Sequence, residues 1–507
     1  MILVVDFGGQ YAHLIARRIR ALGVYAEIAT PAVKAAEVER KAPEGIILSG
    51  GPRSVYEKDG FTLEKKILQM GIPTLGICYG HQLLAHLLGG KVVPGSKEYG
   101  KEILAAKKSA ILKGMGSREQ VWASHGDSVV RQPEGFAVTG STAECAIAAM
   151  EDTRKKIFGV QFHPEVQHTI NGNLVLRNFL RECRARKNYS IDGMDRKLVF
   201  EIREKVGKEA VIMGVSGGVD SLVASVLIRK ATPDIYCVFV DHGMLRKNEA
   251  GEVVELYRKL KFRHFEMVDA SKLFLGRLKG ITDPEQKRKI IGNTFVEVFE
   301  KKVAEMKKHH SIKFLGQGTI YPDRIESAKS SKQASVIKTH HNVGGLPEKM
   351  KLKLVEPLAE LYKDEVRELG KILGIEKKYL DRHPFPGPGL AVRIVGEITP
   401  ERIATLQEAD AIFIEELRKS GYYDRTWQAF AALLPVKAVG VMGDARAYGD
   451  IIALRAVTSQ DAMTADWARL PDELLERVST RITKKVKGVT RVLYDVTQKP
   501  PATIEYE

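Results

Sequence analysis

The fold of this chain is decided at Val211-Ile212-Met213-Gly214-Val215, an apolar run that leads directly into Ser216-Gly217-Gly218-Val219-Asp220-Ser221. An apolar pattern with helical spacing follows at once, so this region predicts a buried strand, a tight loop and a helix. The two glycines let the backbone approach an anion, while the serine hydroxyls and the N–H groups that open the helix are donors. The stretch therefore predicts a phosphate-binding loop; the alternative is a Gly-Ser turn before an ordinary helix.

The loop differs from the Walker pattern G-x-x-x-x-G-K-[ST], because the acidic Asp220 stands where a cation would help to bind phosphates. A carboxylate in this position suits a site at which Mg²⁺ bridges carboxylate and phosphates. The stretch resembles the S-G-G-x-D-S loop of the ATP-pyrophosphatase family. That resemblance implies that residues 216–221 bind the pyrophosphate part of ATP, with Asp220 at the metal, while a substrate oxygen is adenylylated.

Composition restricts the class of protein. The 507 residues are 44% hydrophobic, enough for several cores, and no stretch reaches the ~20 apolar residues of a membrane span. The first residues carry no basic leader, so we expect neither secretion nor membrane insertion. Four distant cysteines without a C-x-x-C pair argue against a zinc knuckle or a disulfide scaffold, and they predict a reducing cytoplasm.

The formal charge of +16 fits nucleic acid, anionic small substrates or a lysine-rich surface, and does not choose among them. The basic runs Lys287-Arg288-Lys289, Lys301-Lys302 and Lys307-Lys308 alternate with apolar residues at helical spacing. We interpret most of them as solvated helix faces.

The N-terminal segment alternates strand-like runs (3–5, 46–48, 74–77) with amphipathic helical stretches (13–22, 61–70), as in a parallel sheet wrapped by helices. The third run ends in Gly76-Ile77-Cys78-Tyr79-Gly80, and a helical pattern follows. This is the spacing of a nucleophile elbow with Cys in place of Ser. Helix N-terminal amides would favour the thiolate, although a structural buried cysteine is the alternative.

A thiolate nucleophile needs a base and a group that orients the base. The stretch Phe158-Gly159-Val160-Gln161-Phe162-His163-Pro164-Glu165 supplies an apolar strand, a histidine and a carboxylate. With Ile47 to Pro52 upstream, the order resembles class I glutamine amidotransferases over about residues 1–185. The resemblance implies that Cys78 forms a glutamyl thioester, His163 transfers the proton, Glu165 orients His163, and the Gly51 and Tyr79 N–H groups form the oxyanion hole. His125, in a stretch like the family's substrate-side loop, is equally well read as a hydrogen-bonded loop histidine.

Apolar periodicity fades from Arg181 to about Met194, which we interpret as a linker. Beyond the phosphate loop, residues 235–240 predict a second strand ending in Asp241-His242-Gly243. His242 and the pairs His309-His310 and His340-His341 lack spaced partners, so we do not expect them to bind a metal.

Three further motifs narrow the family: G-Q-G-T-x-Y-P-D at 316–323, I-K-T-H-H-N at 337–342 and H-P-F-P-G-P-G at 383–389. Together with both domains they resemble the GMP synthetases over essentially the full length. This resemblance implies glutamine, ATP and XMP as substrates, Mg²⁺ with ATP and no organic prosthetic group. It also implies that Arg288, Lys499 and Glu505 contact XMP; for Arg288 the alternative is a solvated residue. NAD synthetases and tRNA-modifying pyrophosphatases share the loop, and a basic nucleic-acid-binding protein with an inactive amidotransferase fold is the non-enzyme alternative.

The predicted fold is α/β: two doubly wound parallel-sheet domains, 1–187 and 188–387, followed by a small α+β domain, 388–507. In the last domain we expect strands at 391–395, 436–441, 451–456 and 491–494, and helices at 401–417 and 474–485. A small sheet with one face covered leaves apolar surface to bury, so we expect a homodimer through this domain, with no membrane or nucleic-acid partner.

Overall fold

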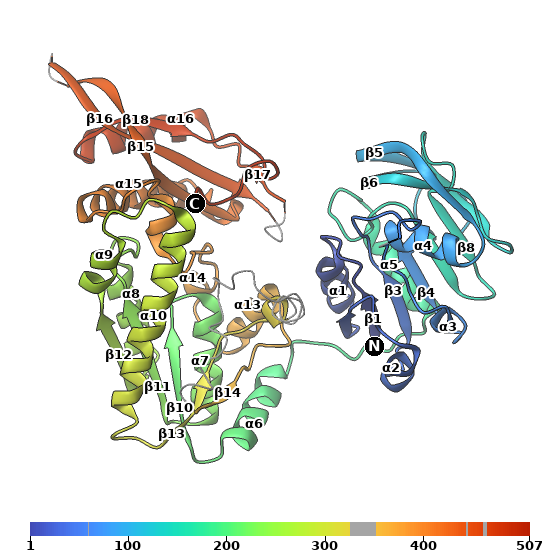
Figure 1. The fold of residues 1–507 in the computed structure, drawn as a ribbon, viewed down its shortest axis with the longest axis horizontal. Helices are drawn as coiled ribbons and strands as arrows, with labels where there is room; N and C mark the ends of the chain where they lie inside the picture. Colours follow the sequence, from blue (N-terminus) through green and yellow to red (C-terminus); the bar gives the residue numbers. More distant parts are fainter. Residues whose placement is uncertain (59, 325–350, 443–444, 460–463) are drawn as a thin grey trace. The chain divides into compact units, whose positions relative to one another are not determined.

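The computed structural model describes residues 1–58, 60–324, 351–442, 445–459 and 464–507. The chain forms two compact units, Met1–Ser190 and Ile191–Glu507, and Figure 1 shows the elements of each. The predicted motif Ile337-Lys338-Thr339-His340-His341-Asn342 lies outside the described residues. Among the described residues, no helix has both the length and the hydropathy to cross a bilayer.

The first unit is built on a nine-stranded sheet in the order β2-β1-β3-β4-β9-β8-β7-β5-β6. Its strands are β1 Ile2–Val5, β2 Ala26–Ala29, β3 Gly45–Leu48, β4 Thr74–Ile77, β5 Lys91–Ala106, β6 Arg118–Arg131, β7 Ala137–Ser141, β8 Ala149–Asp152 and β9 Ile157–Val160. The helices are α1 Ala12–Ala21, α2 Ala35–Lys41, α3 Lys65–Leu68, α4 Tyr79–Leu87 and α5 Gly172–Glu182.

The predicted parallel sheet is confirmed for five neighbouring strands, which pair in parallel in the order β2-β1-β3-β4-β9. The remaining strands are antiparallel, so the sheet of the first unit is mixed rather than wholly parallel. The strands β1, β3, β4 and β9 are buried at every residue, which explains their continuous apolar runs. The predicted helix at 61–70 is shorter, because only Lys65–Leu68 is helical.

The second unit contains a parallel five-stranded sheet in the order β12-β11-β10-β13-β14. Its strands are β10 Ala210–Val215, β11 Ile235–Asp241, β12 His264–Asp269, β13 Ile312–Gly316 and β14 Lys353–Val355. The helices are α6 Met194–Val206, α7 Val219–Ala231, α8 Glu249–Lys259, α9 Ser271–Leu278, α10 Pro284–Met306, α13 Lys363–Ile372 and α14 Lys377–Leu380. The central strand β10 feeds the predicted phosphate loop, whose helix is α7.

A four-stranded sheet follows in the same unit, formed by β15 Gln428–Met442, β16 Ala445–Thr458, β17 Asp466–Trp467 and β18 Val489–Tyr494. The sequence pattern predicted two helices here, and they are α15 Pro400–Lys419 and α16 Asp472–Lys485, which pack together. The predicted strand at 391–395 is wrong: Gly389–Arg393 is a fully buried 3₁₀ helix, η1, and η2 spans Tyr423–Arg425. A short apolar run of this kind does not distinguish strand from helix by periodicity.

One hydrophobic core joins the two sheets of the second unit. It includes Ile212 and Val238 on one side of residue 387 and Leu390, Phe413 and Leu433 on the other. The division of this unit at residue 387 therefore stays a prediction.

Candidate active site

Cys78 lies in a strained turn between β4 and α4. Its backbone has φ +52°, in the left-handed region that a non-glycine residue rarely adopts. The turn is possible because its neighbours are glycines: a Cβ on Gly76 would lie 2.4 Å from the Gly80 oxygen, and one on Gly80 would lie 2.3 Å from the Leu48 oxygen. The backbone therefore closes into a nucleophile elbow that places the sulfur at the carboxyl end of the parallel strands.

His163 and Glu165 follow β9, the strand beside β4, and share this edge of the sheet. His163 Nδ1 is 2.7 Å from Glu165 Oε1, and both side chains are buried. A Cβ on Gly50 would lie 3.7 Å from Cys78 Cβ and 3.9 Å from His163 Nε2, so the ring's other nitrogen faces the cysteine. The structure thus brings the three predicted triad residues together.

The backbone around His163 is anchored on β6. The His163 N–H donates to the Trp122 oxygen (2.9 Å), and Thr169 Oγ1 donates to the His163 oxygen (2.6 Å). The Tyr11 ring packs edge-on at 5.0 Å between ring centroids. These contacts fix the orientation of the imidazole, so Nδ1 stays aligned with the carboxylate.

Burial by itself lowers the pKa of His163, but the negative charges of Glu165 and of the Cys78 sulfur outweigh it and raise the pKa to about 10. The ring is therefore an imidazolium at neutral pH. An imidazolium beside a sulfur anion is the ion pair that a cysteine nucleophile requires.

The two predicted oxyanion-hole residues lie next to each other. A Cβ on Gly51 would lie 3.2 Å from Tyr79 Cγ and 3.0 Å from the Phe7 oxygen, so this position is tightly packed against Tyr79. Tyr79 is the first residue of α4, and its N–H has no acceptor within the helix. Both backbone N–H groups therefore lie beside the elbow.

Residues 124–127 of β6 also border the cysteine. Cys78 Sγ is 3.6 Å from the Ser124 oxygen, and Asp127 accepts bonds from Gln82 and Tyr56. His125 is buried, with Nε2 2.8 Å from Glu98 Oε2 and Nδ1 3.0 Å from the Asp127 oxygen. Of the two roles predicted for His125, these contacts therefore support the hydrogen-bonded histidine.

Glu98, His125 and Cys145 present ligand atoms within 4.8 Å of one another, a spacing that a metal ion would accept. Glu98 Oε1 already accepts a bond from Thr142 (2.6 Å), and its other oxygen and both His125 nitrogens also have partners. Hydrogen bonding accounts for this buried cluster without a metal.

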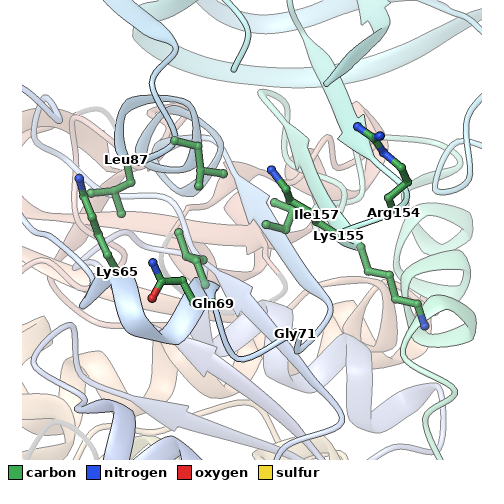
Figure 2. A pocket seen from close by; sticks show the side chains of 10 residues that line it. Lys65, Gln69, Gly71, Leu87, Arg154, Lys155 and Ile157 are labelled. Carbon is green, nitrogen blue, oxygen red and sulfur yellow. The ribbon is translucent and has the colours of Figure 1, made fainter. Parts of the chain in front are cut away.

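A hollow of about 580 Å³ lies elsewhere in the first unit (Figure 2). It is lined by Lys65, Leu68, Gln69, Gly71, Leu87, Leu88, Arg154, Lys155, Lys156 and Ile157. Ile157 begins β9, so the hollow lies at the amino ends of the parallel strands, opposite the edge that carries Cys78. Ligands of open α/β sheets bind at the carboxyl ends, and we assign no role to this hollow.

In the second unit, Ser216 to Ser221 form the predicted loop between β10 and α7. Gly217 has φ +73°, and a Cβ there would lie 2.6 Å from Val253 Cγ2. The Ser216 and Ser221 hydroxyls are 3.2 Å apart, and the Gly218 N–H donates to Ser216 Oγ (3.3 Å). Val219 opens the helix, so the N–H groups of its first turn and two hydroxyls converge where a phosphate would bind.

Lys363 supplies the cation that the loop sequence lacks. It is the first residue of α13, and its Nζ is 3.3 Å from Asp220 Oδ2. Sequence reasoning missed it, because 143 positions separate the two residues and no motif spacing connects them. The lysine and the carboxylate both belong to the rim of the phosphate loop.

Asp220 also fits a magnesium ion. Its Oδ1 is buried and has no hydrogen-bond partner in the described part of the chain, so one carboxylate oxygen remains for a ligand. A carboxylate oxygen beside bound phosphates is the donor that Mg²⁺ prefers. Gly318, of the G-Q-G-T motif after β13, packs against this residue: a Cβ there would lie 3.1 Å from the Asp220 carbonyl carbon.

The turn after β11 packs on the Pro386-Gly387-Pro388-Gly389 segment. A Cβ on Gly389 would lie 2.3 Å from the Met244 oxygen, and the Leu390 N–H donates to that oxygen (2.8 Å). His242 is buried here; burial lowers its pKa to about 4, so its ring is neutral. Its Nδ1 accepts from the Met244 N–H (3.1 Å), which gives it a structural role in the turn.

The three predicted XMP-contacting residues lie on or beside the C-terminal segment. Glu505 bonds to Arg393 and Gln428, and Arg288, on α10, donates to the Glu507 backbone oxygen. Lys499 forms a backbone bridge with Ala465. The predicted solvated face is wrong at Lys287, which is fully buried and donates to the Ile394 oxygen (2.8 Å) and to Glu507.

Known proteins share the sequence that builds this geometry. Residues 3–183 match the family described as "Glutamine amidotransferase class-I", and residues 415–506 match "GMP synthase C terminal domain". The chain is 53% identical over 510 residues to the glutamine-hydrolyzing GMP synthases of Carboxydothermus hydrogenoformans and Aquifex aeolicus, covering 100% of this chain and 99% of each relative. Among solved structures, a glutamine amidotransferase from Thermotoga maritima is 20% identical, covers 36% of this chain and 91% of its own, and has a TM-score of 0.27.

The first unit is thus a class I glutamine amidotransferase domain. The chain as a whole belongs to the glutamine-hydrolyzing GMP synthase family, because full-length relatives match it from end to end at more than half of their residues. The family resemblance and the α/β fold class predicted from the sequence are confirmed.

We predict that His163 keeps its proton to high pH. Its raised pKa means that the charged ring stabilises the folded state fully below pH ~6.5, and that this stabilisation is lost as the pH rises to about 10. Histidine ring ¹⁵N NMR should show one buried ring that loses its proton near pH 10 in the wild type. In Cys78→Ala, which removes one of the two negative charges, the same ring should titrate at lower pH. Titration near pH 6.5 in both proteins would contradict the ion pair.

Proposed function

We propose that the chain is a glutamine-dependent GMP synthetase whose Cys78–His163–Glu165 triad releases ammonia and whose Ser216–Ser221 loop, with Lys363, binds the phosphates of ATP. The observation that carries this proposal is the presence of both constellations in one chain of the GMP synthase family. An ATP-dependent C–N ligase needs both a source of ammonia and a means to activate the oxygen that the ammonia replaces.

At the triad, the Cys78 sulfur attacks the side-chain amide carbon of glutamine, and His163 donates its proton to the departing ammonia. A glutamyl thioester remains, and His163 then removes a proton from the water that hydrolyses it to glutamate. Glu165 holds the ring by its 2.7 Å bond to Nδ1. The Gly51 and Tyr79 N–H groups stabilise the oxyanion, a contribution typically worth ~3 kcal/mol per donor.

In the second unit, the C2 oxygen of XMP attacks the α-phosphorus of ATP, and pyrophosphate leaves. The loop N–H groups, the Ser216 and Ser221 hydroxyls and Lys363 bind the pyrophosphate as its negative charge develops. Asp220 would hold Mg²⁺, which neutralises phosphate charge when bound. Ammonia then adds at C2 and AMP departs, which yields GMP.

For the nucleotide itself we propose Arg288, Lys499 and Glu505 as contacts. Arg288, on α10, donates to the backbone of Glu507, and Arg393, on η1, donates to the side chain of Glu505, two residues before it. This proximity supports one common site for Arg288 and Glu505. A guanidinium suits the phosphate of XMP, and a carboxylate suits the N–H groups of its base.

The cytoplasmic location and the lack of a nucleic-acid partner stay proposals. The four free, buried cysteines are compatible with a reducing compartment. An electrophoretic shift assay with RNA at several salt concentrations tests the second point, because binding to phosphates weakens steeply as salt rises.

Cys78→Ala should abolish GMP synthesis from glutamine and leave synthesis from added ammonia within about twofold of the wild type, because the thiolate serves only to release nitrogen. AMP, pyrophosphate and GMP would be quantified with each nitrogen source. Cys183→Ala, at the buried cysteine directly after the same unit's α5, is the matched control and should retain both activities. Equal loss with both nitrogen sources would reject the two-site mechanism.

Asp220→Asn and Lys363→Met should each lower synthesis by on the order of 10²–10³, whether glutamine or ammonia supplies the nitrogen. Asp220→Asn loses the metal ligand, and Lys363→Met loses the cation at the pyrophosphate. Lys259→Met, at an exposed lysine paired with Glu376, controls for charge removal. Ammonia-dependent turnover at the wild-type rate in either site variant would place the ATP phosphates elsewhere.

We also propose a homodimer through the β15–β16 hairpin. Val439 and Val441 point to one face of β15, Tyr448 lies opposite Val439 on β16, and they are 47%, 75% and 70% exposed. The other face is covered, because Gly440 and Gly449 lie against Thr490. An exposed apolar face of this kind supports self-association.

The double variant Val441→Lys/Tyr448→Lys should sediment as a monomer at micromolar concentration, where the wild type should sediment as a dimer of 56.3 kDa chains. Val130→Lys, at an exposed apolar position of the first unit, should leave the sedimentation unchanged. A monomeric wild type would disprove the dimer, and a dimeric double variant would disprove this interface.

A further inference from the structure

Among the described residues of the second unit, three cations are fully buried, and each pairs with an acidic side chain of the C-terminal segment 495–507. Lys287 pairs with Glu507, Arg393 with Glu505, and Arg455 with Asp495. A buried charge without its partner is strongly destabilising. The segment is therefore a fixed part of the fold, and its acidic residues have defined positions.

Arg393 differs from Lys287 and Arg455 in the geometry of its ion pair, because it donates to both carboxylate oxygens of its partner Glu505. On η1, its Nε donates to Glu505 Oε2 and its Nη2 to Oε1, both at 2.9 Å, in a two-pronged geometry. The guanidinium lies over Phe430, 4.1 Å from the ring centroid, and 5.0 Å from that of Phe385. Aromatic rings and a half-buried carboxylate thus hold the guanidinium plane in place.

The Glu505 carboxylate has one further protein donor among the described residues, Gln428 Nε2, at 2.7 Å from Oε1. Each carboxylate oxygen accepts about two hydrogen bonds. Oε1 has both of its bonds, from Arg393 and Gln428, while Oε2 has one from Arg393. The Glu505 side chain is 19% exposed, so the carboxylate is not sealed off from a ligand, and Oε2 keeps one acceptor direction without a protein donor among the described residues.

Arg455 is a buried arginine that also binds the C-terminal segment 495–507, and it therefore serves as a comparison for Arg393. It donates to the backbone oxygens of Thr497 (2.6 Å) and Thr503 (3.1 Å) and pairs with Asp495 at 3.1 Å. None of these partners is a proposed XMP contact. The two arginines share full burial and attachment to the same segment, and they differ in whether they orient a ligand-binding carboxylate.

We infer that Arg393 is a positioning residue for the purine: it fixes the Glu505 carboxylate so that Oε2 accepts a ring N–H of XMP. This inference rests on the proposed function, because Glu505 belongs to the proposed XMP site. Lysine at position 393 would keep the charge but lose the fork, so the carboxylate could rotate away from the N–H direction. We therefore expect this substitution to weaken the binding of XMP and to leave the binding of ATP unchanged.

The test measures ammonia-dependent GMP synthesis with Arg393→Lys, Arg455→Lys and Glu505→Gln, and the melting temperature of each variant. Arg393→Lys should raise the KM for XMP about tenfold or more and leave the KM for ATP within twofold. Arg455→Lys should lower the melting temperature to a similar extent and leave the KM for XMP within twofold. In the Glu505→Gln background, Arg393→Lys should add less than a twofold further effect, since both changes act through the same carboxylate.

Equal rises in the KM for XMP in the two arginine variants, or an unchanged KM in Arg393→Lys, would overturn the positioning role. If Arg393→Lys does not fold, Gln428→Leu takes its place: it removes one bond from Oε1 and should raise the KM for XMP with ATP unaffected, and an unchanged KM would overturn the inference. A wild type that makes no GMP from XMP and ammonia would reject the proposed function as well. An active wild type with an unaltered Arg393→Lys variant would reject this inference alone.

Discussion

Close backbone packing at the carboxyl ends of parallel strands is the constraint on which both sites depend. At the elbow, Gly80 lies so near the Leu48 oxygen that an added Cβ would be 2.3 Å away, and at the phosphate loop Gly217 lies tightly against Val253. Only glycine permits such approaches. They bring strand, loop and helix N-terminus together, so the nucleophile and the phosphate donors point out of the sheet edge.

Buried charges are the second organising feature, and they act in pairs. In the first unit, His163 pairs with Glu165, and the charges of Glu165 and the Cys78 sulfur together outweigh the effect of burial and raise the pKa of the ring. In the second unit, the buried Arg393 pairs with Glu505, whose side chain is 19% exposed. In each case one member belongs to a proposed site, and its partner fixes its orientation.

The two units therefore perform distinct chemistry with a related design. Each has a set of adjacent parallel strands, a glycine-rich turn after one strand and a side chain from another chain segment that completes the site. For the cysteine that side chain is His163, which follows the adjacent strand β9. For the phosphate loop it is Lys363, which opens a helix beyond the last strand of the sheet. Family membership and this geometry together describe an enzyme that makes ammonia and uses it.

The sequence by itself determined the α/β class, the elbow at Cys78, the partners His163 and Glu165, and the loop at 216–221, because glycine spacing and strand-ending motifs are local signals. Tertiary structure alone decided the burial of Lys287, the 3₁₀ helix at 389–393, the antiparallel half of the first sheet and the approach of Lys363 to Asp220. From the sequence, a charged residue in a basic run is predicted to be solvated. Lys287 is buried because its acidic partner Glu507, 220 positions away in the sequence, packs against it in the folded chain. Contacts over such separations depend on how whole elements pack, and packing leaves no periodic trace in the local sequence.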